Sequence, residues 1–183
     1  MPKTDPNPCQ LCPGSCCDEL AVTLNVVDVA RIHRTLHIPV HDFLARYVDD
    51  DPKEKPYAFT IRRQPIALAL LPPGARDRGC SFLLDIGGHR RCGIYGFRPG
   101  TCRVYPFTDQ GDVVRHKPGT LCPRRFDLDE VDHETIKQEI RRYQDEWNAQ
   151  TKFVEEWNED PPKNASFEKL LDFVAEIVAS ERV

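Results

Sequence analysis

Apolar residues recur every three to four positions over the last third of the chain, the period of a helix with one buried face. The first such stretch predicts a helix over about residues 130–158, with acidic residues in its first turn. The Pro-rich segment from Asp160 to Ala165 ends this helix, and Ser166 can cap a final one. We therefore expect a helical hairpin at the C-terminal end. Its apolar positions are Val131, Ile136, Ile140, Tyr143, Trp147, Val154 and Trp157, followed by Phe167, Leu170, Leu171, Val174, Ile177 and Val178.

The pattern before residue 126 changes repeatedly between helical and extended periods. Asn25 can cap a helix over about 26–37, and a second short helix is predicted over about 40–48. A weakly alternating stretch at 57–62 and a wholly apolar stretch at 66–71 predict two strands, the second buried on both faces. Further predictions are a loop over 1–19, a hairpin over 81–95 around Gly87-Gly88, a short helix opened by Pro99, and a short strand over 113–116. Together these elements predict an α+β fold.

Length and composition fit a small soluble protein. The chain has 183 residues, enough for one domain with an appendage, and 40% of them are hydrophobic. We expect an irregular cysteine- and metal-centred domain over residues 1–125 and a helical extension packing on it over 126–183. No apolar run reaches the roughly 18 residues of a membrane span, and the N-terminus has no apolar signal segment. The sequence therefore predicts a cytoplasmic protein with no membrane partner.

Charge is distributed unevenly along the chain, whose formal net charge is −4. Residues 1–75 carry 8 basic and 9 acidic side chains, residues 76–125 carry 10 and 4, and residues 126–183 carry 7 and 16. The net charges are therefore −1, +6 and −9. A basic middle segment is compatible with phosphate or nucleic acid. The chain has no helix-turn-helix, zinc-finger or RNP-like motif, so a nucleic-acid partner is not expected.

The eight cysteines form two sets. The first is Cys9-x2-Cys12-x3-Cys16-Cys17, and the second consists of Cys80, Cys92, Cys102 and Cys122. A C-x2-C pair lets two thiolates converge on one metal from a tight turn. Disulfides are not expected in a reducing compartment, and the first set has too few apolar neighbours for core packing. The spacing thus favours all eight cysteines as ligands of a metal or an iron–sulfur cluster.

The sequence leaves the identity and number of the centres open. Four thiolates on Zn²⁺ or on a [4Fe–4S]²⁺ cluster leave a net charge of −2, which nearby arginines can offset through N–H···S hydrogen bonds. Adjacent Cys16 and Cys17 are expected to project in different directions, and so to serve different centres or different roles. The candidate arginines are Arg90, Arg91, Arg98 and Arg103, and the alternative is that they form a solvated basic face. Three aromatic residues are expected to shield the centre from water: Tyr95, Tyr105 and Phe107.

The cysteines and their neighbours resemble the YkgJ-type cysteine-cluster family with its CxxCxxxCC signature. The resemblance covers about residues 9–123 and rests on the segments Cys9-Gln-Leu-Cys12-Pro-Gly-Ser-Cys16-Cys17, Cys80-Ser-Phe-Leu, Cys92-Gly-Ile-Tyr95, Arg98-Pro-Gly-Thr-Cys102-Arg-Val-Tyr-Pro-Phe107 and Cys122-Pro. It implies a zinc- or iron-chelating domain. A related motif occurs in flagellin lysine-N-methylase, which is similar only in this domain. This second resemblance implies, as an alternative, a cluster-dependent enzyme of redox or protein-modification chemistry.

The first functional hypothesis is thus a metal-binding protein whose centre, zinc or an iron–sulfur cluster, orders the surrounding loops. Metal removal or Cys12→Ser is then expected to unfold residues 1–125. Metal storage or delivery is a third possibility, and the C-terminal helices could bind a protein partner. No nucleotide-binding loop, nucleophile elbow or H-E-x-x-H motif is present, so no catalytic residue is predicted. His89 is a possible further ligand, with a surface turn as its alternative role.

Overall fold

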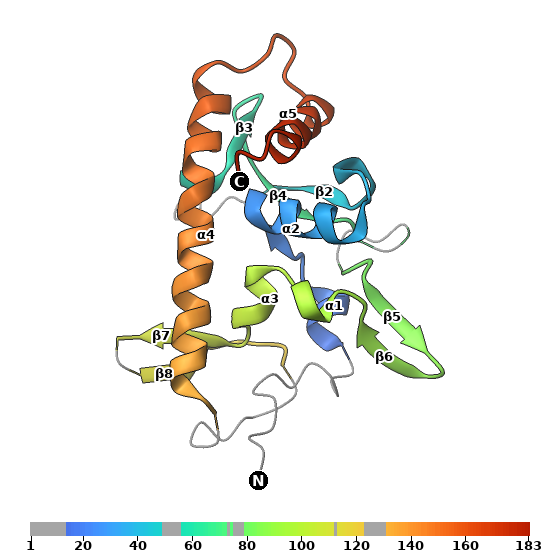
Figure 1. Ribbon diagram of the computed structural model, residues 1–183, viewed down its shortest axis with the longest axis vertical. Helices are drawn as coiled ribbons and strands as arrows, with labels where there is room; N and C mark the ends of the chain where they lie inside the picture. Colours follow the sequence, from blue (N-terminus) through green and yellow to red (C-terminus); the bar gives the residue numbers. More distant parts are fainter. Residues whose placement is uncertain (1–13, 49–55, 73, 75–78, 112, 123–130) are drawn as a thin grey trace.

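The computed structural model of the protein describes residues 14–48, 56–72, 74, 79–111, 113–122 and 131–183. Short helices and small antiparallel sheets make up its first two thirds, and two longer helices follow (Figure 1). This architecture confirms the predicted α+β class. Among the described helices, none combines the length and the apolar content needed to cross a bilayer.

The largest sheet is built around one buried strand. Its four antiparallel strands are β1 (Thr23–Leu24), β2 (Leu44–Val48), β3 (Phe59–Ile61) and β4 (Gln64–Leu70), and β4 pairs with the other three. Ile66 lies opposite Val48 of β2 on one side and Phe59 of β3 on the other. Strand β2 therefore occupies one edge of β4, while β1 and β3 share the other edge. The five residues from Ile66 to Leu70 are all buried, as the wholly apolar pattern predicts.

Three helices pack around this sheet, and two of them begin at the predicted caps. Helix α2 (Val26–Leu36) begins after Asn25, whose side chain accepts a hydrogen bond from the Asp28 amide at 2.9 Å. Helix α5 (Phe167–Ala179) begins after Ser166, whose hydroxyl accepts from the Lys169 amide at 3.3 Å. Helix α4 (His133–Glu159) runs along the length of the molecule (Figure 1). It contacts α2, β3, α3 (Gly100–Val104), β7 (Phe107–Gln110) and β8 (Val113–His116).

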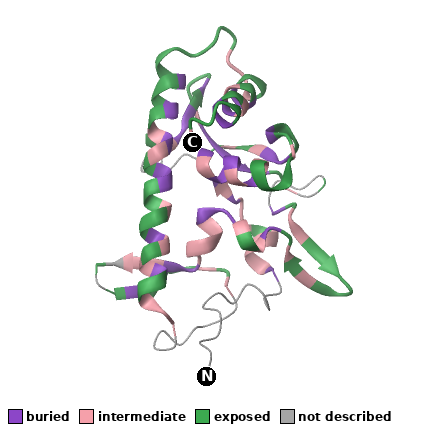
Figure 2. Ribbon diagram, in the orientation of Figure 1, coloured by how far each residue is buried: buried purple, intermediate pink, exposed green. Residues whose placement is uncertain are grey.

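The sheet, α2, α5 and the C-terminal half of α4 share one hydrophobic core. Figure 2 shows buried residues concentrated in the sheet and on parts of these helices. Trp147, Val154 and Trp157 are all buried, so these apolar positions of α4 belong to the protein interior. The predicted division between residues 125 and 126 remains a prediction. The largest fully buried side chains include Leu24, Ile32, Phe43, Phe59, Ile66, Leu68, Leu70, Phe153, Leu170 and Ile177.

The remaining elements are short and lie in the lower half of Figure 1. They are α1 (Ser15–Glu19), β5 (Leu83–Ile86), β6 (His89–Cys92), η4 (Tyr95–Phe97), α3 (Gly100–Val104), β7 (Phe107–Gln110) and β8 (Val113–His116). Strands β5 and β6 form the predicted hairpin, with Gly87 and Gly88 at φ 62° and 78° in its turn. A small second core of Phe107, Val114, Ile136 and Ile140 joins the β7–β8 hairpin to α4.

Two predictions about local structure are wrong, and a third has the wrong bounds. The predicted helix over 40–48 is one 3-10 turn, η2 (Val40–Asp42), followed by strand β2. Its residues pair along a whole edge of β4, and this long-range pairing overrides the local helical spacing. The predicted loop over 1–19 contains helix α1, and its residues before Gly14 lie outside the described part. The predicted strand 57–62 extends only from Phe59 to Ile61, because Arg62 and Arg63 form the turn into β4.

Candidate metal centre

Five cysteines from four separate segments line one small cavity. Cys16 and Cys17 come from α1, Cys80 from the turn before β5, Cys92 from the end of β6, and Cys102 from α3. The cavity has a volume of about 70 Å³, and its other lining residues are mainly apolar. The structure thus brings together members of both cysteine sets. Cys9 and Cys12 lie outside the described residues.

Backbone hydrogen bonds hold the segment of Cys17 against that of Cys80. The Cys80 amide donates to the Cys17 carbonyl at 2.7 Å, and the Gly79 amide donates to the Leu20 carbonyl at 3.3 Å. Helix α1 begins after Gly14, which has a φ of 83°. An added Cβ at Gly14 would lie 3.0 Å from the Leu83 side chain, so both the backbone and the space favour glycine there.

An ion pair fixes α1 to the β5–β6 hairpin. The Arg90 guanidinium donates two hydrogen bonds to the carboxylate oxygens of Asp18. This fork-to-fork geometry restricts orientation as well as distance. Arg90 is therefore engaged in positioning the segment that carries Cys16 and Cys17, and its predicted role as a donor to thiolates is not observed.

The sulfur atoms of Cys16 and Cys17 lie 4.0 Å apart. The prediction that these adjacent side chains diverge is therefore wrong: both line the same cavity. Thiolates bound tetrahedrally at about 2.3 Å from zinc lie about 3.8 Å from each other. The spacing of this pair is thus close to that of two ligands of one metal ion.

Burial and mutual repulsion favour the neutral thiol at most of these positions. Burial raises the pKa of Cys80 to about 11 and also raises the pKa of Cys92 and Cys102. The hydrogen bond between the vicinal pair lowers the pKa of Cys16 to about 7 and raises that of Cys17. A cation in the cavity reverses this balance, because it attracts thiolates and expels their protons. Five thiols, of which Cys80 is buried and the others are half-buried, line a cavity with few polar neighbours and fit a soft, thiophilic metal centre.

Arg98 is the one predicted arginine that lines the cavity. It is only 8% exposed, its guanidinium carbon lies 3.9 Å from the centre of the Tyr95 ring, and its Nε donates to the Tyr95 carbonyl at 3.1 Å. The charge of Arg98 lowers the pKa of Cys16 and of Cys92, although burial outweighs it at Cys92. Arg103 pairs with acidic residues of α4, and Arg91 is exposed.

Of the three aromatic residues predicted to shield the centre, one lines the cavity. Tyr105 lines the cavity, and its hydroxyl oxygen accepts from the Leu121 amide at 2.5 Å. Burial raises the pKa of Tyr105, and the charges of Cys16 and Cys122 act in the same direction. Tyr105 therefore connects the cavity to Cys122. Phe107 does not shield the cavity, since it belongs to the second core with Val114 and α4.

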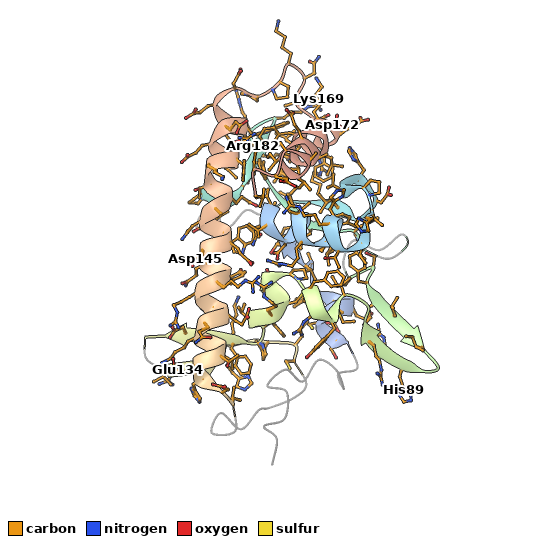
Figure 3. The ribbon with its side chains drawn as sticks, viewed as in Figure 1. His89, Glu134, Asp145, Lys169, Asp172 and Arg182 are labelled. Atoms are coloured by element: carbon orange, nitrogen blue, oxygen red, sulfur yellow. The ribbon has the colours of Figure 1, made fainter. Side chains whose placement is uncertain are left out.

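The described residues alone do not complete a metal site. No group of three or more His, Cys, Asp or Glu side chains within them could hold a metal ion as it stands. His89 is exposed, and Figure 3 shows it at the far end of the β5–β6 hairpin. A bound centre would therefore need the lining thiols to draw together, or thiols from outside the described residues to join them.

A buried ionic network that sequence reasoning missed anchors the helix of Cys102. Asp28, in the first turn of α2, accepts a hydrogen bond from the Gly100 amide of α3 at 2.9 Å and another from Arg31 at 2.6 Å. Glu146 of α4 accepts from Arg31, from Arg103 at 2.9 Å and from Arg142 at 3.1 Å. The network joins α2, α3 and α4, whose residues are too far apart in sequence for spacing to reveal it.

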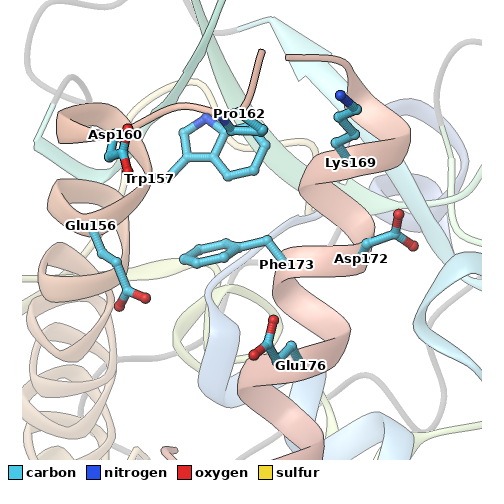
Figure 4. A pocket seen from close by; sticks show the side chains of 8 residues that line it. All are labelled: Glu156, Trp157, Asp160, Pro162, Lys169, Asp172, Phe173 and Glu176. Atoms are coloured by element: carbon cyan, nitrogen blue, oxygen red, sulfur yellow. The ribbon is translucent and has the colours of Figure 1, made fainter. Parts of the chain in front are cut away.

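A second hollow lies between α4 and α5. It is an open groove of about 420 Å³, and Figure 4 shows the rings of Trp157 and Phe173 between acidic side chains. Two of its carboxylates already have partners: Glu156 pairs with Arg182, and Asp172 with His41. The predicted protein partner of the C-terminal helices remains a prediction.

The fold and the cavity define a small α+β protein that gathers thiols from distant segments into one apolar site. Its residues 8–123, more than half of the chain, match the family described as "CxxCxxCC: Putative zinc- or iron-chelating domain". The protein therefore belongs to this metal-chelating family, and the resemblance found in its sequence is confirmed. No curated protein and no solved structure matches the chain.

Proposed function

We propose that the protein binds zinc or an iron–sulfur cluster in the cysteine-lined cavity beside α3. One observation carries the proposal: Cys16, Cys17, Cys80, Cys92 and Cys102 arrive from four segments at one largely apolar cavity. Thiolates are the ligands that both zinc and iron–sulfur clusters take in proteins. When bound, zinc supplies a fixed charge that ties the segments together, and a cluster adds the capacity to carry an electron.

Eight candidate ligands exceed the four that one centre needs. The five lining thiols supply the nearest set, and Cys122 interacts with Tyr105 without lining the cavity itself. Cys9 and Cys12 precede α1 by only a few residues, so they join the same centre or form a second one with the thiols left over. We propose one centre built mainly from the lining cysteines, because both sequence sets already meet there.

The centre is also expected to stabilise the fold around it. Helix α1 has five residues and none of them is fully buried, and the β5–β6 hairpin exposes most of its side chains. An isolated one-turn helix and an isolated hairpin are marginal in water. Metal binding would therefore contribute directly to the folding free energy of these segments.

Elemental analysis and a visible spectrum of the anaerobically purified full chain test the proposal. Stoichiometric zinc in a colourless protein, or iron with the broad visible absorption of a cluster, is the expected result. Cys102→Ser should weaken retention of the metal against a chelator by more than about tenfold, since even loss of an outer partner costs about that much. Ser81→Ala, next to Cys80 and exposed, is the matched control and should retain the metal.

A protein that holds no metal after purification, or one in which Cys102→Ser holds it as tightly as the wild type, would contradict the proposal. The catalytic alternative and the storage or delivery role remain predictions. A cluster that gains and loses an electron reversibly would favour the catalytic alternative. Metal that exchanges freely with a weak chelator would favour storage or delivery.

A further inference from the structure

Arg98 presents a buried hydrogen-bond donor that the described protein groups do not satisfy. Its Nη1 atom is buried and has no partner among them, although its Nε is taken by the Tyr95 carbonyl. The residue is 8% exposed and lines the cysteine cavity. A buried, incompletely paired guanidinium is costly, because it loses water without gaining equivalent hydrogen bonds. A ligand in the cavity beside Arg98 would accept the hydrogen bond that this buried donor lacks.

The thiols do not account for this donor. Arg98 lies close enough to Cys16 and Cys92 for its charge to affect both, yet in the present arrangement of the five thiols its Nη1 atom donates to none of their sulfur atoms. The cavity has a volume of about 70 Å³, roughly twice the 30 Å³ that one liquid water occupies. It has room for a metal ion and for further atoms bound to that ion.

We propose that the centre carries an anionic ligand that the protein does not supply, and that Arg98 donates a hydrogen bond to it. The ligand would be either an inorganic sulfide of an iron–sulfur cluster or a small anion at an open position of a metal ion. Both are anionic acceptors that neutralise the buried guanidinium. The inference rests on the proposed metal-binding function and narrows it, because it excludes a zinc ion closed by four cysteines.

Two preparations of the full chain test this inference. The first is purified anaerobically and assayed for acid-labile sulfide. The second is loaded with Co²⁺ and titrated with azide, which displaces or joins a non-protein ligand and thereby changes the visible spectrum. Labile sulfide in the first preparation identifies a cluster, and a saturable spectral change in the second identifies an open metal position.

Variants at Arg98 decide whether the guanidinium serves that ligand. Arg98→Met should weaken azide binding roughly ten- to hundredfold, or cause a comparable acceleration of sulfide loss, since a charged hydrogen bond is removed. Arg98→Lys keeps the positive charge but lacks the planar guanidinium. Its azide affinity, or its rate of sulfide loss, should therefore lie between those of the wild type and Arg98→Met. Arg91→Met, an exposed arginine next to Cys92, should match the wild type in both assays.

The inference is overturned if the protein binds metal but contains no labile sulfide and gives a Co²⁺ spectrum indifferent to azide. It is also overturned if Arg98→Met behaves as the wild type. If Arg98→Met does not fold, Arg98→Lys and the wild-type assays still decide. A chain that binds no metal in either preparation contradicts the proposed function itself, so the two failures are distinguishable.

Discussion

The two ends of the protein are held together by different interactions. The core end consists of the four-stranded sheet, α2, α5 and the C-terminal half of α4, where large apolar side chains such as Phe59 and Phe153 are completely buried. The cysteine end consists of α1 and residues 79–104, which include the β5–β6 hairpin and α3, and there Ile94 is the largest fully buried apolar side chain among the described residues. Apolar burial stabilises the first end directly. At the cysteine end, the thiol side chains surround a cavity instead of a core of large apolar side chains.

This difference indicates which part of the fold depends on a ligand. The core end can form from its own side chains. The cysteine end adds only Cys80 and Ile94 to the buried core among its described residues, and its other attachments include two carboxylate contacts, Asp18 with Arg90 and Asp28 with Gly100. Regions with few buried apolar contacts open locally at low free-energy cost. A metal bound by the thiols of the cysteine end would therefore stabilise that end against local opening.

The largest expected effect is the loss of order at the cysteine end when its metal is removed. After chelation, the amides of Cys80, Gly93 and Cys102 should exchange hydrogen with solvent more than about tenfold faster, because their hydrogen bonds lie in segments with little apolar burial. The amides of β4 should keep their protection. Hydrogen-exchange mass spectrometry of the loaded and stripped chain measures both. Equal loss of protection at both ends, or none at either, would contradict the comparison.

The second prediction concerns a substitution that destabilises the core end. Phe153→Ala removes a side chain that is 0% exposed and should destabilise the protein by about 3–5 kcal/mol. Because the cysteine end rests against the same helices, both ends should then unfold together in urea. Ile86→Ala, at a residue 60% exposed, is the control and should change the unfolding free energy by no more than about 0.5 kcal/mol.

The parts of the fold that the sequence predicts well are those governed by local signals. The apolar repeats of α4 and α5 and the caps at Asn25 and Ser166 act within one turn of helix, so they can be recognised without knowledge of the rest of the chain. The buried strand β4 is similarly marked by its unbroken apolar run. Strand β2 escapes prediction because its identity depends on pairing with residues about twenty positions further along.

In the candidate site, too, the features that depend on local signals are predicted well and those that depend on the tertiary fold are not. Cysteine spacing indicates metal chemistry, since thiol chemistry is a property of the residue type itself. It does not reveal that Cys16 and Cys17 converge, or that Arg98 is buried beside them while Arg90 and Arg103 have acidic partners. Those outcomes depend on Asp18, Glu139 and Glu146, whose positions are set by the tertiary fold.

A medium effect is expected where a buried carboxyl joins the two ends. Burial raises the pKa of Asp28 from 3.8 to about 6, against the attraction of Arg31, and its second carboxylate oxygen has no partner among the described groups. The folded state therefore binds more protons than the unfolded state between about pH 4 and 6. The contribution of Asp28 to stability consequently falls as the pH rises through this window and is constant above it.

Asp28→Asn isolates this effect, since its amide oxygen can still accept from Gly100 but does not titrate. From about pH 4 to 7, the wild type should lose roughly 3 kcal/mol of unfolding free energy relative to Asp28→Asn, measured by urea denaturation. Asp42→Asn, at an exposed position, should follow the wild type. Identical pH profiles for the wild type and Asp28→Asn would show that the carboxyl titrates alike in the folded and unfolded states.

The smallest expected effect is a gain in stability at the core end alone. Arg62 and Arg63 connect β3 to β4 in a two-residue turn, with φ of 51° and 67°. This left-handed backbone disfavours residues with a Cβ, and Asn-Gly is the pair that such hairpin turns prefer. The double variant Arg62→Asn with Arg63→Gly should therefore stabilise the protein by about 1 kcal/mol and raise its Tm by about 2–4 °C, measured by thermal denaturation.

The same turn also separates a backbone effect from a charge effect. A double variant with alanine at both positions removes the two charges of Arg62 and Arg63 but keeps both Cβ atoms, so it should show no gain in Tm. A gain in that control would mean that charge, rather than backbone conformation, limits this turn. Metal retention should be unchanged in both double variants, because the turn belongs to the core end. Altered retention would mean that the core end and the cysteine end are coupled more tightly than their different interactions imply.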